Sequence, residues 1–105
     1  MAFIALEQLS RLHDGYQRAF SVEGQALLLC QLEGQVFVIE NRCPHMDVSL
    51  TSATQLPGPM LRCSAHGIAF DMISGKAQGP LADTLGCLKK FPLVYEGAQV
   101  GVDLT

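Results

Sequence analysis

Two short clusters of metal-ligating residues stand out in this chain of 105 residues. Cys43 and His45 form a C-x-H pair, and Cys63 and His66 form a C-x-x-H pair that begins after seventeen intervening residues. Each pair offers one thiolate and one imidazole, so the four residues supply two sulfur and two nitrogen ligands. That set suits an iron-sulfur centre with one sulfur-ligated and one nitrogen-ligated iron, or a tetrahedral zinc ion.

The joint spacing of the two pairs favours an iron-sulfur centre over zinc or a site without metal. A single C-x-H or C-x-x-H is weak, because cysteine is often a small buried hydrophobe and histidine an ordinary surface or core residue. Two such pairs are more specific, and Gly67 follows the second one. Structural zinc knuckles usually take two cysteines from one C-x-x-C turn, and neither pair has that form.

Composition and turn residues predict a single all-β domain. Hydrophobic residues make up 49% of the chain and charged residues 16%, which argues against disorder. Short apolar stretches are separated by pairs such as Glu23-Gly24 and Glu33-Gly34, which favour hairpins. The stretches expected to form strands are Tyr16–Val22, Ala26–Leu32, Gln35–Glu40, Met60–Cys63, Ile68–Ile73, Leu85–Phe91 and Ala98–Leu104.

The remaining segments connect these strands. Leucines at every third position predict a short helical turn over Leu6–Leu12. The connection Thr51–Pro59 contains two prolines and a glycine, and we expect it to be stiff and irregular. Both ligand pairs follow strand ends, so that their loops can meet at one tip of the fold.

The two pairs and their neighbours resemble the signature of Rieske 2Fe-2S proteins. In that family the first pair is followed by an apolar residue, here Leu50, and the second by glycine and an aromatic residue, here Gly67 and Phe70. Ser64 departs from the proline that the family commonly has there, which leaves the loop less rigid at its start. The resemblance is greatest to small bacterial Rieske ferredoxins. It implies one domain, residues 1–105, an antiparallel β-sandwich or barrel with a small cluster-binding subdomain of two ligand loops at about 41–81.

The resemblance also implies the arrangement of the ligands. Cys43 and Cys63 would hold one iron of a single 2Fe-2S cluster, and His45 and His66 would hold the other, with their ring edges at the surface. Two thiolates and two neutral imidazoles leave the oxidised centre without net formal charge. Adding an electron is therefore easier than in an all-cysteine cluster.

Residues near the pairs lack the features of high-potential relatives. Those relatives carry hydroxyl groups where this chain has Ile68 and Phe70, and a disulfide whose cysteines would align with Val48 and Ala65. We therefore expect a reduction potential near the low end of the Rieske range, about −150 mV. Gly79-Pro80 resembles the segment that covers the cluster in the family.

No catalytic residues are predicted in this chain. Rieske oxygenases add a mononuclear iron held by two histidines and a carboxylate, and after the cluster ligands only His13 remains. The resemblance implies an electron carrier: a flavin-dependent NAD(P)H reductase would supply the electron, and a terminal ring-hydroxylating oxygenase would receive it at the His45/His66 tip. Two alternatives stay open, a small Rieske-type subunit of a larger reductase such as nitrite reductase, and a zinc-stabilised interaction module.

Other sequence features concern location and partners. The first six residues are apolar but lack a basic residue and reach Glu7 too soon for a signal peptide, and no run approaches the roughly 18 apolar residues of a membrane span. We expect a cytoplasmic monomer with no membrane or nucleic-acid partner, in which Cys30 and Cys87 are reduced core thiols. The formal charge of −3 permits steering toward basic patches on partners without requiring it.

Overall fold

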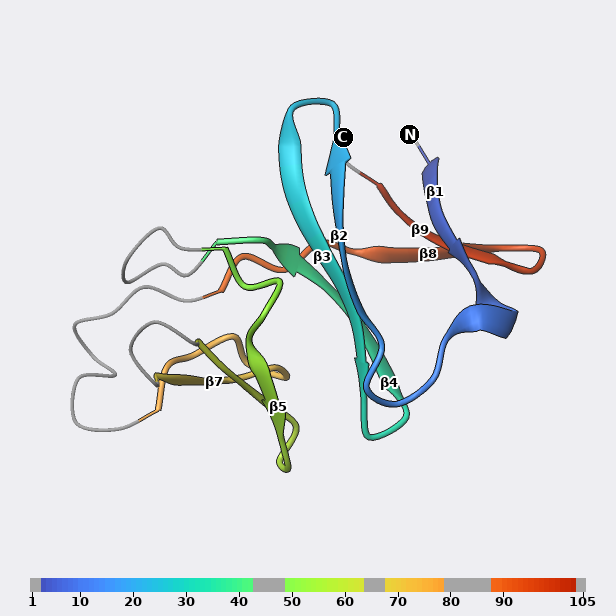
Figure 1. Ribbon diagram of the computed structural model, residues 1–105. Coiled ribbons are helices and arrows are strands. Elements are labelled where there is room, and N and C mark those ends of the chain that lie inside the picture. The colour runs from blue at the N-terminus through green and yellow to red at the C-terminus, as the bar shows by residue number, and fades with distance from the viewer. Residues whose placement is uncertain (1–2, 43–48, 64–67, 79–87, 104–105) are drawn as a thin grey trace.

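The computed structural model describes residues 3–42, 49–63, 68–78 and 88–103. Within these ranges the chain forms strands and one short 3-10 helix, so the all-β prediction is confirmed (Figure 1). The elements are β1 Phe3–Gln8, η1 Leu9–Arg11, β2 Gln17–Val22, β3 Gln25–Leu32, β4 Gln35–Glu40, β5 Thr54–Leu56, β6 Met60–Arg62, β7 Ala69–Asp71, β8 Leu93–Glu96 and β9 Gln99–Asp103. No helix in these ranges is long and apolar enough to cross a membrane.

The strands form three antiparallel sheets of three strands each. Their orders are β1-β9-β8, β2-β3-β4 and β5-β6-β7. The β2-β3-β4 sheet lies in the middle, with the β8-β9 hairpin on one side and the small β5-β6-β7 sheet on the other (Figure 1). The predicted antiparallel sandwich is confirmed, and the described strands form separate sheets rather than one closed barrel.

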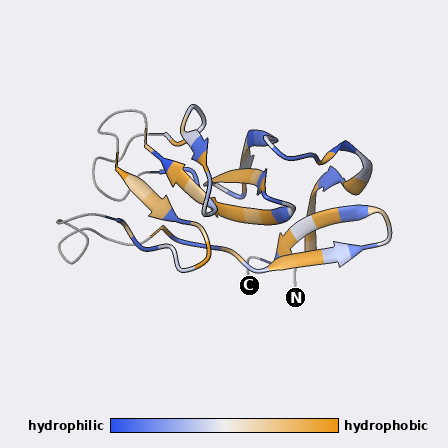
Figure 2. Cartoon of the chain, turned by 90° about the horizontal axis from the view of Figure 1, so that it is seen from below, coloured by the Kyte–Doolittle hydropathy of each residue, from blue (hydrophilic) through white to orange (hydrophobic). Residues whose placement is uncertain are grey.

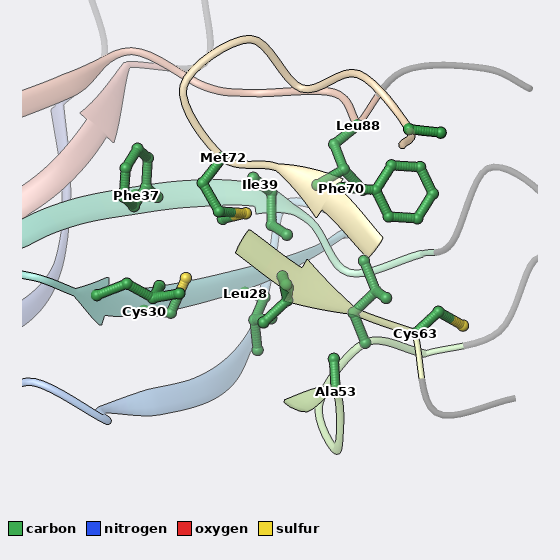
Figure 3. Packing of buried hydrophobic residues seen from close by; sticks show 13 residues of the cluster. Leu28, Cys30, Phe37, Ile39, Ala53, Cys63, Phe70, Met72 and Leu88 are labelled. Atoms are coloured by element: carbon green, nitrogen blue, oxygen red, sulfur yellow. The ribbon is translucent and has the colours of Figure 1, made fainter. Parts of the chain in front are cut away.

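Strand β3 is buried on both faces, which explains its nearly continuous apolar sequence. Successive side chains in a strand point to opposite faces. Leu27 and Leu29 pack in a cluster with Val100 and Val102 of β9. Leu28 and Cys30 pack in a second cluster that extends to the small sheet; its buried members are Leu28, Cys30, Leu32, Phe37, Ile39, Leu50, Ala53, Leu61, Cys63, Phe70, Met72, Ala77 and Leu88 (Figure 3). Figure 2 shows hydrophobic residues along the paired strands.

The Glu-Gly turns behave as predicted. Glu23 and Gly24 between β2 and β3 have φ values of 49° and 81°, and Glu33 and Gly34 between β3 and β4 have 50° and 76°. Positive φ at both central residues matches the right-handed twist of a two-residue hairpin. These turns fix the register of the central sheet, in which Leu28 is paired with Ile39.

At the N-terminal end one strand was missed and one expectation is corrected. Phe3–Gln8 is a strand that pairs with β9, and the predicted helical turn over Leu6–Leu12 is reduced to η1. The leucines at positions 6, 9 and 12 are all partly buried against the Leu27 cluster, which accounts for their spacing. Tertiary packing has therefore overridden the local periodicity.

One strand prediction and the prediction for one connection are wrong in part. A strand was expected over Leu85–Phe91. The described residues 88–91 form only an isolated bridge between Lys90 and Ile39, and strand β8 begins at Leu93. Residues 85–87 lie outside the described residues. The connection expected to be irregular contains β5, which pairs with β6 across the turn at 57–59.

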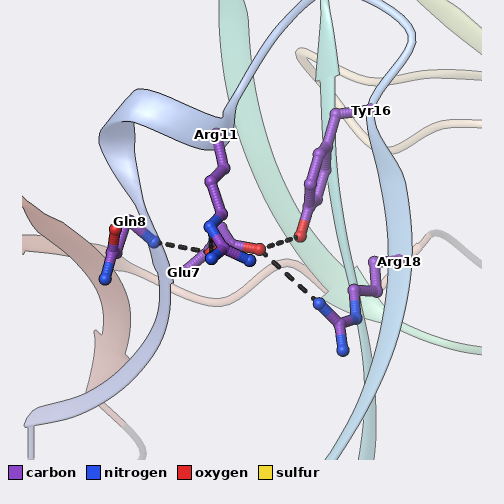
Figure 4. Close-up of polar contacts among 5 residues, drawn as sticks. All are labelled: Glu7, Gln8, Arg11, Tyr16 and Arg18. Atoms are coloured by element: carbon purple, nitrogen blue, oxygen red, sulfur yellow. Dashed lines mark hydrogen bonds and ion pairs between the residues drawn. The ribbon is translucent and has the colours of Figure 1, made fainter.

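A polar cluster links β1 to the segment leading into β2 (Figure 4). The Glu7 carboxylate accepts hydrogen bonds from the Tyr16 hydroxyl at 2.7 Å and the Gln8 backbone N–H at 2.8 Å. Arg18 lies 3.7 Å and Arg11 4.0 Å from it. The Gln8 and Tyr16 hydrogen bonds, with help from the two arginines, lower the pKa of Glu7 below its ordinary value of 4.5. The ionised Glu7 carboxylate thus holds β1 against the start of β2.

Candidate metal centre

Of the four predicted ligands, the structure describes only Cys63. Cys43, His45 and His66 lie outside the described residues, so whether the four residues converge stays a prediction. The described part on its own contains no group of three His, Cys, Asp or Glu side chains that could hold a metal ion. What the structure does describe is how the chain enters and leaves each ligand segment.

Cys63 follows β6 directly and is fully buried as a free thiol. Its backbone N–H donates to the Ile68 carbonyl at 2.8 Å, which joins the two ends of the segment that contains His66. The side chain belongs to the same apolar cluster as Leu61 and Phe70 (Figure 3). The cysteine of the second ligand pair is therefore anchored in the core shared by the small sheet and β3-β4.

The segment that contains Cys43 and His45 is joined at its ends by the side chain of Asn41. Its Oδ1 accepts the Leu50 backbone N–H at 2.8 Å, and its Nδ2 donates to the Thr51 hydroxyl at 2.9 Å. We call this pair of bonds the Asn41 clasp. Leu50 is fully buried in the cluster of side chains that contains Cys63. The clasp therefore connects the ends of the first ligand segment to the core around Cys63.

A second amide side chain reaches the same segment from the central sheet. Gln17 of β2 donates through Nε2 to the carbonyls of Thr51 at 2.7 Å and Ala53 at 2.9 Å. Gln55 donates to Gln17 Oε1 at 3.1 Å and so orients this amide. The chain after the first ligand pair is thus held from β2 and from the end of β4.

A third segment, residues 79–87, also begins and ends at the small sheet. Before it, the Gln78 N–H donates to the Ala69 carbonyl at 2.8 Å; after it, the Leu88 N–H donates to the Gly75 carbonyl at 2.8 Å. Gly75 has a φ of +79°, and a Cβ there would lie 3.0 Å from the Leu88 carbonyl oxygen, so glycine is required. The proposed covering pair Gly79-Pro80 itself lies outside the described residues.

The surroundings of Cys63 fit an iron-sulfur cluster of the predicted ligand set. A lone thiolate in an apolar core would carry an uncompensated charge. A cluster with two thiolates and two neutral imidazoles is formally neutral when oxidised, which suits the apolar side chains around Cys63. Ile68 is partly buried and Phe70 fully buried, and neither side chain can donate a hydrogen bond, so the expectation of a low potential is unchanged.

The other singled-out residues have structural surroundings. Cys30 is a free, fully buried thiol, so its predicted core position is confirmed, and burial raises its pKa to about 12. His13 is exposed in the turn before β2, as expected, with Nδ1 3.0 Å from the Asp14 carbonyl oxygen. Cys87 lies outside the described residues.

Two residues at the ends of the ligand segments, Asn41 and Gln17, were not predicted from the sequence. The position of Asn41 next to the first ligand pair could have indicated it, whereas Gln17 gives no local signal.

The fold and the sequence family together define a small iron-sulfur protein of the Rieske class. The Rieske [2Fe-2S] domain family matches residues 2–92, and the chain belongs to that family. The family description names a [2Fe-2S] cluster as the cofactor, in agreement with the prediction from the ligand pairs.

Similar proteins cover nearly the whole chain. The ferredoxin component of the naphthalene 1,2-dioxygenase system of Pseudomonas putida is 30% identical over 97 residues, which are 92% of this chain and 90% of that protein. The solved Sphingomonas yanoikuyae B1 ferredoxin is 28% identical, with a TM-score of 0.84 over 99% of this chain and 100% of that one. A chain in the complex of reduced oxygenase and oxidized ferredoxin in carbazole 1,9a-dioxygenase shares the fold, with a TM-score of 0.82 and 24% identity over 95% of this chain and 91% of that one.

Proposed function

We propose that this chain is a one-electron carrier that takes electrons from a flavin-dependent NAD(P)H reductase and delivers them to a terminal ring-hydroxylating oxygenase. The observation that carries the proposal is the similarity to a dioxygenase ferredoxin component over 92% of this chain and 90% of that protein. The chain is then the electron-transfer component of an oxygenase system, and the catalytic site belongs to another polypeptide.

The proposed ligands are Cys43 and Cys63 at one iron and His45 and His66 at the other. When bound, the cluster supplies one reversible electron near neutral formal charge. The apolar side chains around Cys63 keep water from its thiolate, and the lack of hydroxyl donors at Ile68 and Phe70 favours a reduction potential of about −150 mV. The His45/His66 tip would be the docking site for both partners.

The proposal includes one domain, with the cluster-binding subdomain at about 41–81, that acts as a cytoplasmic monomer. It is supported by the buried cluster of side chains that joins β3-β4 to the small sheet, and by Cys30 and Cys63 as free cysteines. Gel filtration of the protein from its source cells distinguishes a free carrier from a bound reductase subunit. A free carrier elutes near its own mass of 11.3 kDa, and stable co-elution with a large subunit contradicts the proposal.

Electron paramagnetic resonance of the dithionite-reduced protein tests the cluster and its ligands. We expect one unpaired electron per chain and a Rieske-type signal that changes in His45→Cys and in His66→Cys. His13→Cys is the matched control, because that histidine is exposed in the loop before β2, and the signal of this variant should stay as in the wild type. An unchanged signal in either ligand variant rejects that ligand, and a colourless protein that contains zinc rejects the electron-carrier function.

A further inference from the structure

Asn41 stands at the entry to the first ligand segment and is itself firmly placed. Its backbone N–H donates to the Ala26 carbonyl at 2.9 Å, which ties it to β3. From this position its side chain spans to the chain that leaves the segment, where it bonds the Leu50 N–H and the Thr51 hydroxyl. One side chain therefore sets the separation between the two ends of the segment that contains Cys43 and His45.

Hydroxyl groups strengthen the same connection. The Ser49 hydroxyl lies 2.8 Å from the Thr51 hydroxyl and donates to Asn41 Oδ1 at 3.4 Å. Ser49 also accepts the Thr51 backbone N–H at 3.2 Å. The amide and the two hydroxyls form a closed ring of hydrogen bonds across the ends of the segment.

Gln17 fixes the exit of the segment to a different element. Its amide bonds the carbonyls of Thr51 and Ala53, while Gln55 bonds both Gln17 Oε1 and the Tyr16 carbonyl. The backbone between Leu50 and Ala53 is thus held by side chains from β2 on one hand and from the end of β4 on the other. Movement of this exit relative to β2 would break several of these bonds at once.

These contacts contribute more to placement than to global stability. Asn41 is partly buried, Ser49 and Thr51 are exposed, and a hydrogen bond of this kind contributes about 0.5–1.5 kcal/mol to folding. An iron-sulfur cluster held by two separate segments, in contrast, stays bound only while both ligand pairs are at bonding distance from it at the same time. Groups that orient metal ligands without touching the metal commonly change metal affinity by about 10- to 100-fold.

We propose that Asn41 and Gln17 are positioning residues for the cluster: the Asn41 clasp and the Gln17 amide hold the first ligand segment in register with Cys63. This inference rests on the proposed Rieske centre. The two amide side chains would keep the cluster bound and fix the shape of its electron paramagnetic resonance signal. Neither residue belongs to the ligand motif.

The test compares Asn41→Ala and Asn41→Asp with a matched variant in the turn before β2, Asp14→Ala. Asp14 makes a similar side-chain connection, since its Oδ1 accepts the Gly34 N–H at 2.8 Å and a Gln31 Nε2–H at 3.0 Å, but both of these partners lie in the turn and strand of the central sheet and not at the ends of a ligand segment. Three quantities are measured on each holoprotein: the rate at which visible absorbance is lost to an iron chelator, the line widths of the electron paramagnetic resonance signal, and the melting temperature.

We expect Asn41→Ala to lose its cluster about tenfold faster than the wild type and to show a broadened signal. Asp14→Ala should lower the melting temperature by a similar amount while leaving cluster loss and signal unchanged. Asn41→Asp keeps an acceptor for the Leu50 N–H but loses the donor to Thr51, so its rate should lie between wild type and Asn41→Ala. This milder variant also serves if Asn41→Ala does not fold.

Gln17→Glu extends the test to β2, because a carboxylate facing the Thr51 and Ala53 carbonyls cannot donate to them. It should also accelerate cluster loss. The positioning role is rejected if cluster loss in the Asn41 variants equals that of Asp14→Ala or follows only the melting temperature. It is also rejected if Gln17→Glu matches the wild type. If the wild-type holoprotein gives no mixed-ligand signal, the proposed function itself fails, which is a different result.

Discussion

The molecule contains two regions that reach stability by different means. The basal region, residues 3–40 and 91–103, is built from strands of four to eight residues, and two-residue turns join β2 to β3, β3 to β4 and β8 to β9. The cluster-binding region, residues 41–90, has three described strands of three residues each, and side chains of Asn41, Gln17 and Gln55 hold its irregular backbone. Hydrogen bonds between backbone strands thus stabilise the basal region. In the cluster-binding region, amide side chains and a shared apolar core position the ends of the ligand segments.

The largest expected difference between the regions concerns two buried thiols. Cys30 lies in β3 and Cys63 follows β6; both are free, fully buried and members of one apolar cluster. We expect Cys63→Ala to abolish iron binding, because it removes a thiolate ligand. Cys30→Ala should retain full iron content and lose about 1–2 kcal/mol of unfolding free energy through a small cavity.

Iron analysis and visible spectra of the two variants check this prediction, with far-ultraviolet circular dichroism to verify that both fold. Wild-type iron content in Cys63→Ala would reject Cys63 as a ligand. Iron loss in Cys30→Ala without unfolding would show that Cys30 is also needed to hold the cluster.

Adjacent leucines of β3 allow a finer comparison between the two faces of the central sheet. Leu27 packs toward β9 and Leu28 toward the cluster of Cys63, and both are fully buried. Leu27→Ala and Leu28→Ala should each lower the unfolding free energy by about 2–5 kcal/mol. Only Leu28→Ala should also accelerate cluster loss, because its cavity opens on the side of Cys63.

Denaturant titration measures the first effect, and chelator-driven loss of visible absorbance in buffer measures the second. Equal cluster lifetimes in the two variants would mean that the face on which a cavity forms is unimportant. The cluster would then respond to global stability alone.

The comparison between regions also explains what the sequence could predict. The central hairpins were accessible because β3 is a long apolar run and Glu33-Gly34 is a turn signal that acts locally. β1 was missed because its partner, β9, lies at the other end of the chain. The ligand pairs were found from residue types and spacing. Gln17 was missed because its target carbonyls lie more than thirty residues away, and amide side chains obey no spacing rule.

A smaller effect is expected at the polar cluster around Glu7, which belongs to the basal region. Hydrogen bonds from Gln8 and Tyr16 lower the pKa of Glu7 in the folded protein. The resulting stability is present above the ordinary pKa of 4.5 and is lost as the pH falls through the lower folded value. Glu7→Gln should therefore lower the unfolding free energy at pH 7 by about 1–2 kcal/mol and weaken its decline below pH 4.5.

Thermal unfolding between pH 3 and about pH 7 checks this prediction. Glu23→Gln removes the same formal charge from an exposed turn and is the matched control. The cluster signal at pH 7 should be unchanged in both variants. An acid-induced decline in Glu7→Gln as steep as in the wild type would show that other groups dominate the acid sensitivity.

The two regions finally differ in charge. The cluster-binding region has five basic and three acidic side chains, a formal charge of +2, whereas the rest of the chain has two basic and seven acidic ones, a charge of −5. The molecule is 42 Å long, and charges are screened over about 8–10 Å at physiological ionic strength. A reagent that reacts at the ligand segments should therefore respond to nearby charges more than to the net charge of −3.

Two variants with the same net charge test this point. Arg62→Gln with Lys76→Gln removes two exposed basic side chains from the cluster-binding region, and Ser21→Glu with Gln35→Glu adds two acidic ones at exposed positions of the basal region. The rate measured is that of one-electron transfer from the reduced protein to ferricyanide, a trianion. The first variant should slow it about two- to fivefold at low ionic strength, the second should leave it nearly unchanged, and high salt should remove the difference. Equal slowing would mean that the net charge governs the encounter, and steering toward basic partner patches would then be the better expectation.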